Sequence, residues 1–176
     1  MIETPKVDWF ALAPVLALLG ASGVCLLGAV LVPASARRAV TAAVAGAGFV
    51  TAGILAGLVF DASAQAELQI AESMTRDRLA TLAQVIVAGA GALTVLVSWS
   101  GRRRSHVGEY YALLTAAGAG MLFFVQAGNL MTLFLGLEWF SIALYVLCAL
   151  DTERRASLEA GLKYLIVGSF GSGILL

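Results

Sequence analysis

The stretch NLMTLFLGLEWFSIALYVLCAL, residues 129–150, decides the fold of this chain. It is apolar over the roughly 20 residues that an α-helix needs to cross a bilayer. One full charge, Glu138, lies well inside it. A carboxylate near the bilayer centre costs about 2.5–3.5 kcal/mol on insertion scales, and a leucine there would stabilise the helix better. Glu138 is therefore the first candidate functional residue.

The composition of the whole chain is that of a membrane protein. Its 176 residues are 60% hydrophobic and 12% charged, against about 25% charged residues in a soluble domain. The net charge is zero, so nothing indicates nucleic-acid binding. Cys25 and Cys148 lie in apolar runs without CxxC spacing and are interpreted as small buried residues. No His/Cys cluster resembles a metal or iron–sulfur site, and His106 is interpreted as a solvated loop residue.

Six apolar runs predict an all-α, polytopic transmembrane helix bundle of about six helices. The first run is too long for a signal-peptide core and has no positive segment before it, so it is expected to be retained. Many small residues within the runs favour close helix packing. The 61–78 segment is predicted to be a solvated connector, with a short surface helix as the alternative. The runs cover residues 9–32, 39–60, 79–99, 110–127, 130–150 and 158–176.

Basic residues in the loops predict the orientation in the membrane. One side holds three of them and the other side seven. The seven-charge side is predicted to be cytoplasmic, which places the N-terminus outside. The three are Lys6, Arg76 and Arg78; the seven are Arg37, Arg38, Arg102, Arg103, Arg104, Arg154 and Arg155. The tract GRRRSH at 101–106 is interpreted as a topology signal, with contact to anionic lipid or a soluble partner as the minor alternative.

Polar residues form a narrow stripe along the helix that carries Glu138. At helical spacing, Ser141 and Tyr145 lie on the same face as Glu138. A carboxyl group there can exchange a proton with ordered water or with a basic partner, which is what a proton relay needs. The alternative is a structural carboxyl group held by interhelix hydrogen bonds. Gln84 and Gln126 are interpreted as interhelix hydrogen-bond formers.

Lys163 is the second charge within an apolar run and the second candidate relay residue. Three interpretations stay open. Lys163 can serve as a switchable base, it can pair with Glu159 one helical turn earlier, or it can extend toward the interface. The short loop between the last two runs predicts antiparallel neighbouring helices. Counting from that loop, the depths of Glu138 and Lys163 differ by roughly 9 Å, which is too far for a direct ion pair.

The order and spacing of NLMTLFLGLE, SIALYVL and RRASLEAGLKY resemble the N subunit of bacterial type I NADH–quinone oxidoreductase, the complex I subunit 2 family. The resemblance is densest over residues 108–176. Over residues 1–107 it extends only to hydropathy and topology. It implies two regions: residues 1–107 would form three leading transmembrane helices with loops, and residues 108–176 would form the start of the first antiporter-like repeat.

The resemblance implies a proton-translocating membrane-arm subunit of respiratory complex I, which couples electron transfer from NADH to quinone to proton pumping. Glu138 and Lys163 match the family's proton-relay positions. The chain itself is expected to hold no cofactor and no metal, because FMN, the iron–sulfur clusters and quinone belong elsewhere in the complex. The expected partners are other membrane-arm subunits and the lipid bilayer. The expected location is the bacterial inner (plasma) membrane, with the N-terminus outside.

The length of the chain departs from this family. Family members have about fourteen helices, with two inverted five-helix repeats after three leading helices, a common transporter design. This sequence ends within the sixth helix and is therefore expected to be a fragment or a truncated product. The alternatives are a subunit of a multisubunit cation/proton antiporter or of a membrane-bound hydrogenase, and a non-pumping structural membrane subunit. The tract RRASLEAGLKY favours complex I.

Overall fold

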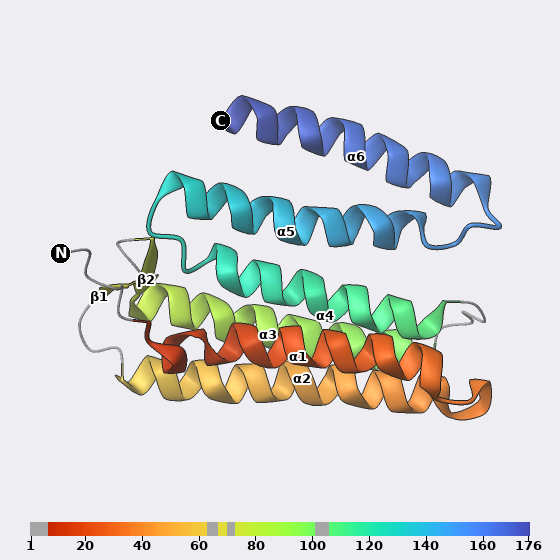
Figure 1. Cartoon of the computed structure of the whole chain (residues 1–176), viewed down its shortest axis with the longest axis horizontal. Coiled ribbons are helices and arrows are strands. Elements are labelled where there is room, and N and C mark those ends of the chain that lie inside the picture. The colour runs from red at the N-terminus through yellow and green to blue at the C-terminus, as the bar shows by residue number, and fades with distance from the viewer. Residues whose placement is uncertain (1–6, 63–66, 70–72, 101–105) are drawn as a thin grey trace.

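The computed structural model describes residues 7–62, 67–69, 73–100 and 106–176, and within them it contains six α-helices and one short antiparallel strand pair (Figure 1). Lys6 and the Arg102–Arg104 run, which contributed to the predicted topology, lie outside these described residues. The elements in chain order are α1 (Trp9–Leu31), α2 (Ala34–Ala62), β1 (Glu67–Gln69), β2 (Met74–Arg76), α3 (Arg78–Trp99), α4 (Val107–Phe124), α5 (Leu130–Ala149) and α6 (Arg155–Leu175).

The helix bundle predicted from the apolar runs is confirmed. Five helices, α1 to α5, are long and apolar enough to cross a membrane. The sixth helix, α6, is not among these five, because Glu159, Lys163 and several glycines and serines lower its hydropathy. The prediction for the 61–78 connector is wrong where that segment is described. Between the end of α2 and the start of α3, the described residues form the strand pair β1 and β2, with Leu68 opposite Thr75, and not the short surface helix or a plain connector.

Helices α1 to α4 surround the buried core, and α5 and α6 extend from it as a row (Figure 1). The core includes Leu18, Phe49, Tyr111 and Leu122, each at most 2% exposed. Helix α5 packs on α4, and α6 packs on the other side of α5. The predicted antiparallel contact between α5 and α6 is therefore confirmed, and α6 is the outermost helix of the row.

Side-chain caps mark the starts of the three helices that begin at the hairpin end of the bundle. Asp8 accepts from the backbone N–H of Phe10 at 2.9 Å, at the start of α1. Asp77 and Asn129 cap α3 and α5 in the same way, with bonds of 2.6 and 2.8 Å. Such caps satisfy backbone donors that have no partner inside the helix and stabilise a helix by about 1 kcal/mol. These polar residues therefore explain why the helices begin where they do.

At two glycines, helices α4 and α5 are in direct backbone contact. A Cβ atom at Gly136 would lie 2.7 Å from the Cα atom of Phe124, and one at Gly120 would lie 2.8 Å from the backbone nitrogen of Phe140. Only glycine allows helices to approach this closely. By contrast, a Cβ atom at Gly57, part of a GxxxG pattern, would meet nothing within 4 Å. A GxxxG pattern alone therefore does not show where two helices are in backbone contact.

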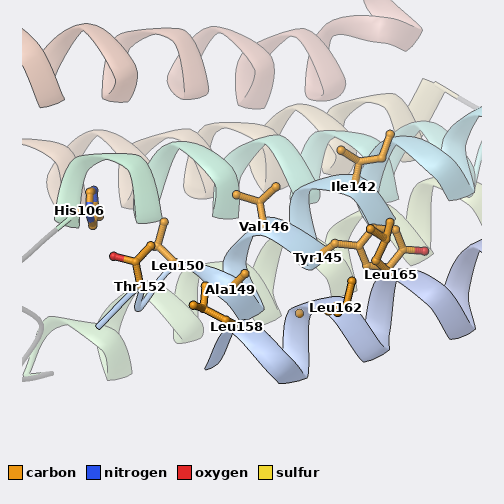
Figure 2. Close-up of a pocket in the computed structure, with 11 residues that line it drawn as sticks. His106, Ile142, Tyr145, Val146, Ala149, Leu150, Thr152, Leu158, Leu162 and Leu165 are labelled. Carbon is orange, nitrogen blue, oxygen red and sulfur yellow. The ribbon is translucent and has the colours of Figure 1, made fainter. Parts of the chain in front are cut away.

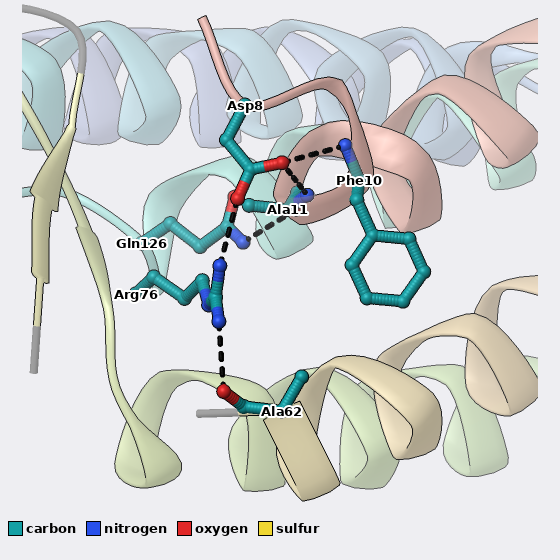
Figure 3. A network of polar contacts seen from close by, with 6 residues as sticks. All are labelled: Asp8, Phe10, Ala11, Ala62, Arg76 and Gln126. Atoms are coloured by element: carbon teal, nitrogen blue, oxygen red, sulfur yellow. Dashed lines mark hydrogen bonds and ion pairs between the residues drawn. The ribbon is translucent and has the colours of Figure 1, made fainter. Parts of the chain in front are cut away.

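The strand pair ties several helix ends together (Figure 3). Arg76, in β2, forms an ion pair with Asp8 at 2.8 Å and donates to the carbonyl oxygen of Ala62 at 2.7 Å. Gln126, after α4, donates to the carbonyl oxygen of Ala11 in α1 at 3.0 Å. The backbone N–H of Thr75 donates to the carbonyl oxygen of Gln126 at 2.7 Å. Through these bonds the β2 segment links the ends of α1, α2 and α4.

Replacing Arg76 by glutamine is expected to destabilise the protein by about 1–3 kcal/mol, because Asp8 loses its charged partner and the Ala62 carbonyl loses a donor. The side chains of Arg76 and Asp8 are only 17% and 29% exposed, so solvent compensates poorly. Thermal unfolding of the purified protein measures the change. Arg78→Gln is the matched control, because the side chain of Arg78 stacks on the Phe60 ring, 5.6 Å from its centroid, and forms no ion pair among the described residues. Equal losses in the two variants would contradict the role assigned to Arg76.

Candidate functional site

Glu138 lies on the side of α5 that faces α6. Its stripe partners Ser141 and Tyr145 are both 7% exposed. The ring of Tyr145 packs edge-on against Tyr164 of α6, with centroids 4.8 Å apart. The opposite side of α5 contacts α4 through Gly136 and Phe140. The predicted stripe is therefore part of a helix–helix interface, and Glu138 is at its end nearest the start of α5.

One carboxylate oxygen of Glu138, Oε1, is fully buried and has no hydrogen-bond partner among the described residues. A buried carboxylate without a partner is costly, whereas a protonated carboxyl group at the same place is much less so. An oxygen in this position can hold a proton or accept a hydrogen bond from water. The structure therefore does not supply the interhelix bonds that a purely structural carboxyl group would need for this atom.

Lys163 lies on the other side of α6. Gly161 and Gly168 contact α5 through Ala149 and Tyr145, and at 100° per residue Lys163 points away from that contact face. Its Nζ atom is 2.6 Å from Oε1 of Glu159, with side chains 72% and 64% exposed. The i,i+4 ion pair left open by the sequence is therefore formed. The two candidate residues are not brought together.

The distance between the two charges along the bundle is longer than the predicted 9 Å. The contacts of Gly161 with Ala149 and of Gly168 with Tyr145 place Lys163 level with residues 147–150 of α5. Glu138 then lies roughly 13–18 Å further along, at 1.5 Å per residue. The predicted distance was too short because the first turn of α6 extends past the end of α5. There the side chain of Ser157 donates to the carbonyl oxygen of Cys148.

The structure agrees with the predictions for the two glutamines and for one of the two cysteines. Gln84 donates to the carbonyl oxygen of Leu122 at 3.2 Å, and Gln126 bonds α1, so both form interhelix hydrogen bonds as predicted. Cys25 is fully buried as predicted, but the prediction for Cys148 is wrong. Cys148 is exposed because it lies beside the α4 and α6 contact faces of α5 rather than on either of them.

His106 is an exposed loop residue, as predicted. It precedes α4 in a left-handed backbone conformation (φ 54°), and its Nδ1 atom lies 3.7 Å from Glu109. It also lines a groove over α5. Tyr164 and Gly168 complete the contact with the stripe. The sequence did not single out Tyr164, whereas Gly168 is one of the small residues predicted to favour close helix packing. No group of three or more His, Cys, Asp or Glu side chains that could hold a metal ion occurs in the described part of the chain.

A match to a known protein family covers the site. Residues 127–176, which include Glu138 and Lys163, match the family described as NADH:quinone oxidoreductase/Mrp antiporter, TM. This transmembrane family and the apolar helices together indicate a multi-pass membrane protein.

Curated relatives extend the similarity to the whole chain. NADH-quinone oxidoreductase subunit N of Rhodobacter capsulatus is 45% identical over 92 residues, which are 52% of this chain and 19% of the relative. The subunit N of Hirschia baltica is 37% identical over 128 residues, 69% of this chain and 27% of the relative. Subunit N 2 of Roseiflexus castenholzii is 32% identical over 176 residues, 99% of this chain and 34% of the relative.

The chain thus spans between about a fifth and a third of the length of these relatives. The division into residues 1–107 and 108–176 stays a prediction. The resemblance read from the sequence is confirmed: this chain is similar to subunit N of bacterial NADH-quinone oxidoreductase.

Proposed function

We propose that this chain is part of a proton-translocating membrane-arm subunit of a respiratory NADH–quinone oxidoreductase. The observation that supports this most directly is the buried, unpartnered Oε1 atom of Glu138 within a membrane-spanning helix. An ionisable group in such a place is a functional candidate by default, because it costs stability. The similarity to subunit N gives the complex in which the group would act.

In this proposal Glu138 takes up and releases a proton at the α5/α6 interface. Ser141 and Tyr145 extend the polar stripe on the same face and provide hydroxyl groups next to it. Lys163 is the second station, and its charge is shared with Glu159. Because these stations are roughly 13–18 Å apart, further residues or water must connect them. Electron transfer belongs to the whole complex, and no step of it involves a residue of this chain.

The membrane, the orientation of the chain in it and the partner subunits are part of the same proposal. The chain would lie in the bacterial inner membrane with its N-terminus outside. Among the described basic residues near the helix ends, Arg37, Arg38, Arg154 and Arg155 share one end of the bundle, and Arg76 and Arg78 lie at the other end. Its partners would be other membrane-arm subunits. It would hold no cofactor itself, and FMN, iron–sulfur clusters and quinone would bind elsewhere.

A second candidate function is cation/proton antiport, because the matching family includes Mrp antiporters. The buried carboxyl group would serve either activity.

Removing the gene from the native organism tests the two proposals together. Under the first, membrane vesicles lose proton uptake driven by NADH and sensitive to quinone-site inhibitors, and the protein copurifies with NADH dehydrogenase activity. Under the second, NADH-driven uptake persists and proton exchange against a Na⁺ or K⁺ gradient is lost. Vesicles that keep both activities would contradict both proposals and favour a structural membrane subunit.

A further inference from the structure

An apolar groove of about 500 Å³ runs along α5 beside α6, and it ends near His106 at the start of α4 (Figure 2). Ile142, Val146, Leu162 and Leu165 line the upper part of the groove, which is the part farther from the α5–α6 loop and lies toward the right in Figure 2. His106 and Thr152 lie at its lower end, near that loop and toward the left in Figure 2. From Ile142 to Leu150, also a lining residue, the groove extends along α5 for roughly 12 Å. That is most of one leaflet of a hydrocarbon core about 30 Å thick.

Among the described residues, the groove is open to one side. Ile142 is 56% exposed and Leu162 58%. Its upper part has no polar side chain other than the hydroxyl group of Tyr145, and that group is directed at Gly168 of α6. A ligand with a polar group at depth, such as a quinone ring, would therefore find few partners there. A flexible hydrocarbon chain needs none.

The lower end of the groove, in contrast to its apolar upper part, lies near positively charged side chains. Arg154 and Arg155 are exposed, and no ion pair involves either of them among the described residues. Arg154 lies one helical turn before the lining residue Leu158. Both arginines lie at the depth where phospholipid headgroups meet the ends of the helices. A cation near an anionic membrane surface is stabilised by the phosphate groups there.

We propose that this groove binds one acyl chain of an anionic phospholipid, with its headgroup against Arg154 and Arg155. The lipid would fill the groove over α5 and stabilise the packing of α6 against α5. This inference concerns the chain's own surface and does not depend on proton transport.

Photolabelling of the full-length protein in its native membrane tests the proposal. The probes are phosphatidylglycerol and phosphatidylcholine, each with a photoreactive group in one acyl chain, and the labelled peptides are identified by mass spectrometry. We expect phosphatidylglycerol to label the peptide that contains residues 142–165 several-fold more than phosphatidylcholine does. Equal labelling by the two lipids would mean ordinary boundary lipid, and no labelling would mean that another protein segment fills the groove. Either result would overturn the proposal.

Two pairs of variants separate the acyl chain from the headgroup. Val146→Trp fills the groove and is expected to lower labelling by both lipids, while Val97→Trp, on the 77%-exposed Val97 of α3, is expected to change neither. Labelling at the groove that survives Val146→Trp would refute the site.

For the headgroup, the double variant Arg154→Gln/Arg155→Gln is expected to reduce phosphatidylglycerol labelling several-fold, down to the phosphatidylcholine level. The control is Asp151→Asn/Glu153→Gln in the same loop, which removes charge of the opposite sign and is expected not to reduce labelling. Equal reductions in the two double variants would show that the arginines do not bind the headgroup.

Discussion

Replacement of Glu138 by glutamine lowers proton transport by roughly tenfold or more, with the subunit present in the membrane in normal amount, if Glu138 carries the proton as proposed. Glutamine keeps the size and hydrogen-bonding capacity of the side chain but cannot release a proton at any accessible pH. The Oε1 atom has no hydrogen-bond partner among the residues that the structure describes, so the substitution removes the ionisable proton and is expected to leave the packing of the side chain unchanged. Proton uptake by vesicles, measured per NADH oxidised, reports the change.

The matched control is Glu109→Gln. Glu109 lies in the first turn of α4, is 43% exposed and contacts His106 only at 3.7 Å. The same chemical change there is expected to leave proton transport near the wild-type rate. Glu138→Asp keeps a carboxyl group and is expected to retain part of the transport. A fully assembled Glu138→Gln variant that pumps at the wild-type rate would refute the relay role.

Most of the fold follows from apolar periodicity and length. All six helices form where apolar runs stand, and their boundaries differ from the runs by at most five residues. The largest difference is at the start of α2. There the polar stretch 34–38 continues the helix after Pro33, because proline is favourable at a helix start and cannot continue the preceding one. Hydropathy does not detect that effect.

The orientation of a side chain toward a neighbouring helix was harder to predict. Glu138, Ser141 and Tyr145 were identified correctly as one stripe, because helical spacing alone puts them on one face. For Lys163 the sequence left three interpretations open, and the structure shows the one in which it pairs with Glu159 and points away from α5. The register of α6 against α5 depends on contacts such as Gly161 with Ala149. A single sequence contains no signal for such pairs.

The strand pair between α2 and α3 could not be predicted from the sequence either. Each strand has three residues, too few for an alternating pattern to be recognised. The pair is stabilised by distant partners, such as the backbone bond from Gly128 to the carbonyl oxygen of Ser73 at 2.8 Å. Two-stranded pairs are marginal without such support. The connector could therefore not be assigned from its local sequence.

A methyl group at Gly136 is expected to destabilise the protein by about 1–3 kcal/mol or more, because it overpacks a contact that has no flexible atom to yield. The Cβ atom of a Gly136→Ala variant would lie 2.7 Å from the backbone Cα of Phe124, so α5 would have to move away from α4. Gly57→Ala is the matched control. Its Cβ atom meets nothing within 4 Å, and alanine in a helix is favoured over glycine by up to about 1 kcal/mol.

The two substitutions are therefore expected to change stability in opposite directions, as measured by thermal unfolding of the purified protein. A neutral Gly136→Ala variant would mean that the helices are not in backbone contact at this point. The result also bears on the site, because Gly136 lies two residues before Glu138 in α5. If the α4–α5 contact positions Glu138 at the α6 interface, Gly136→Ala lowers proton transport even where enough protein folds. Gly57→Ala, remote from α5, leaves transport unchanged.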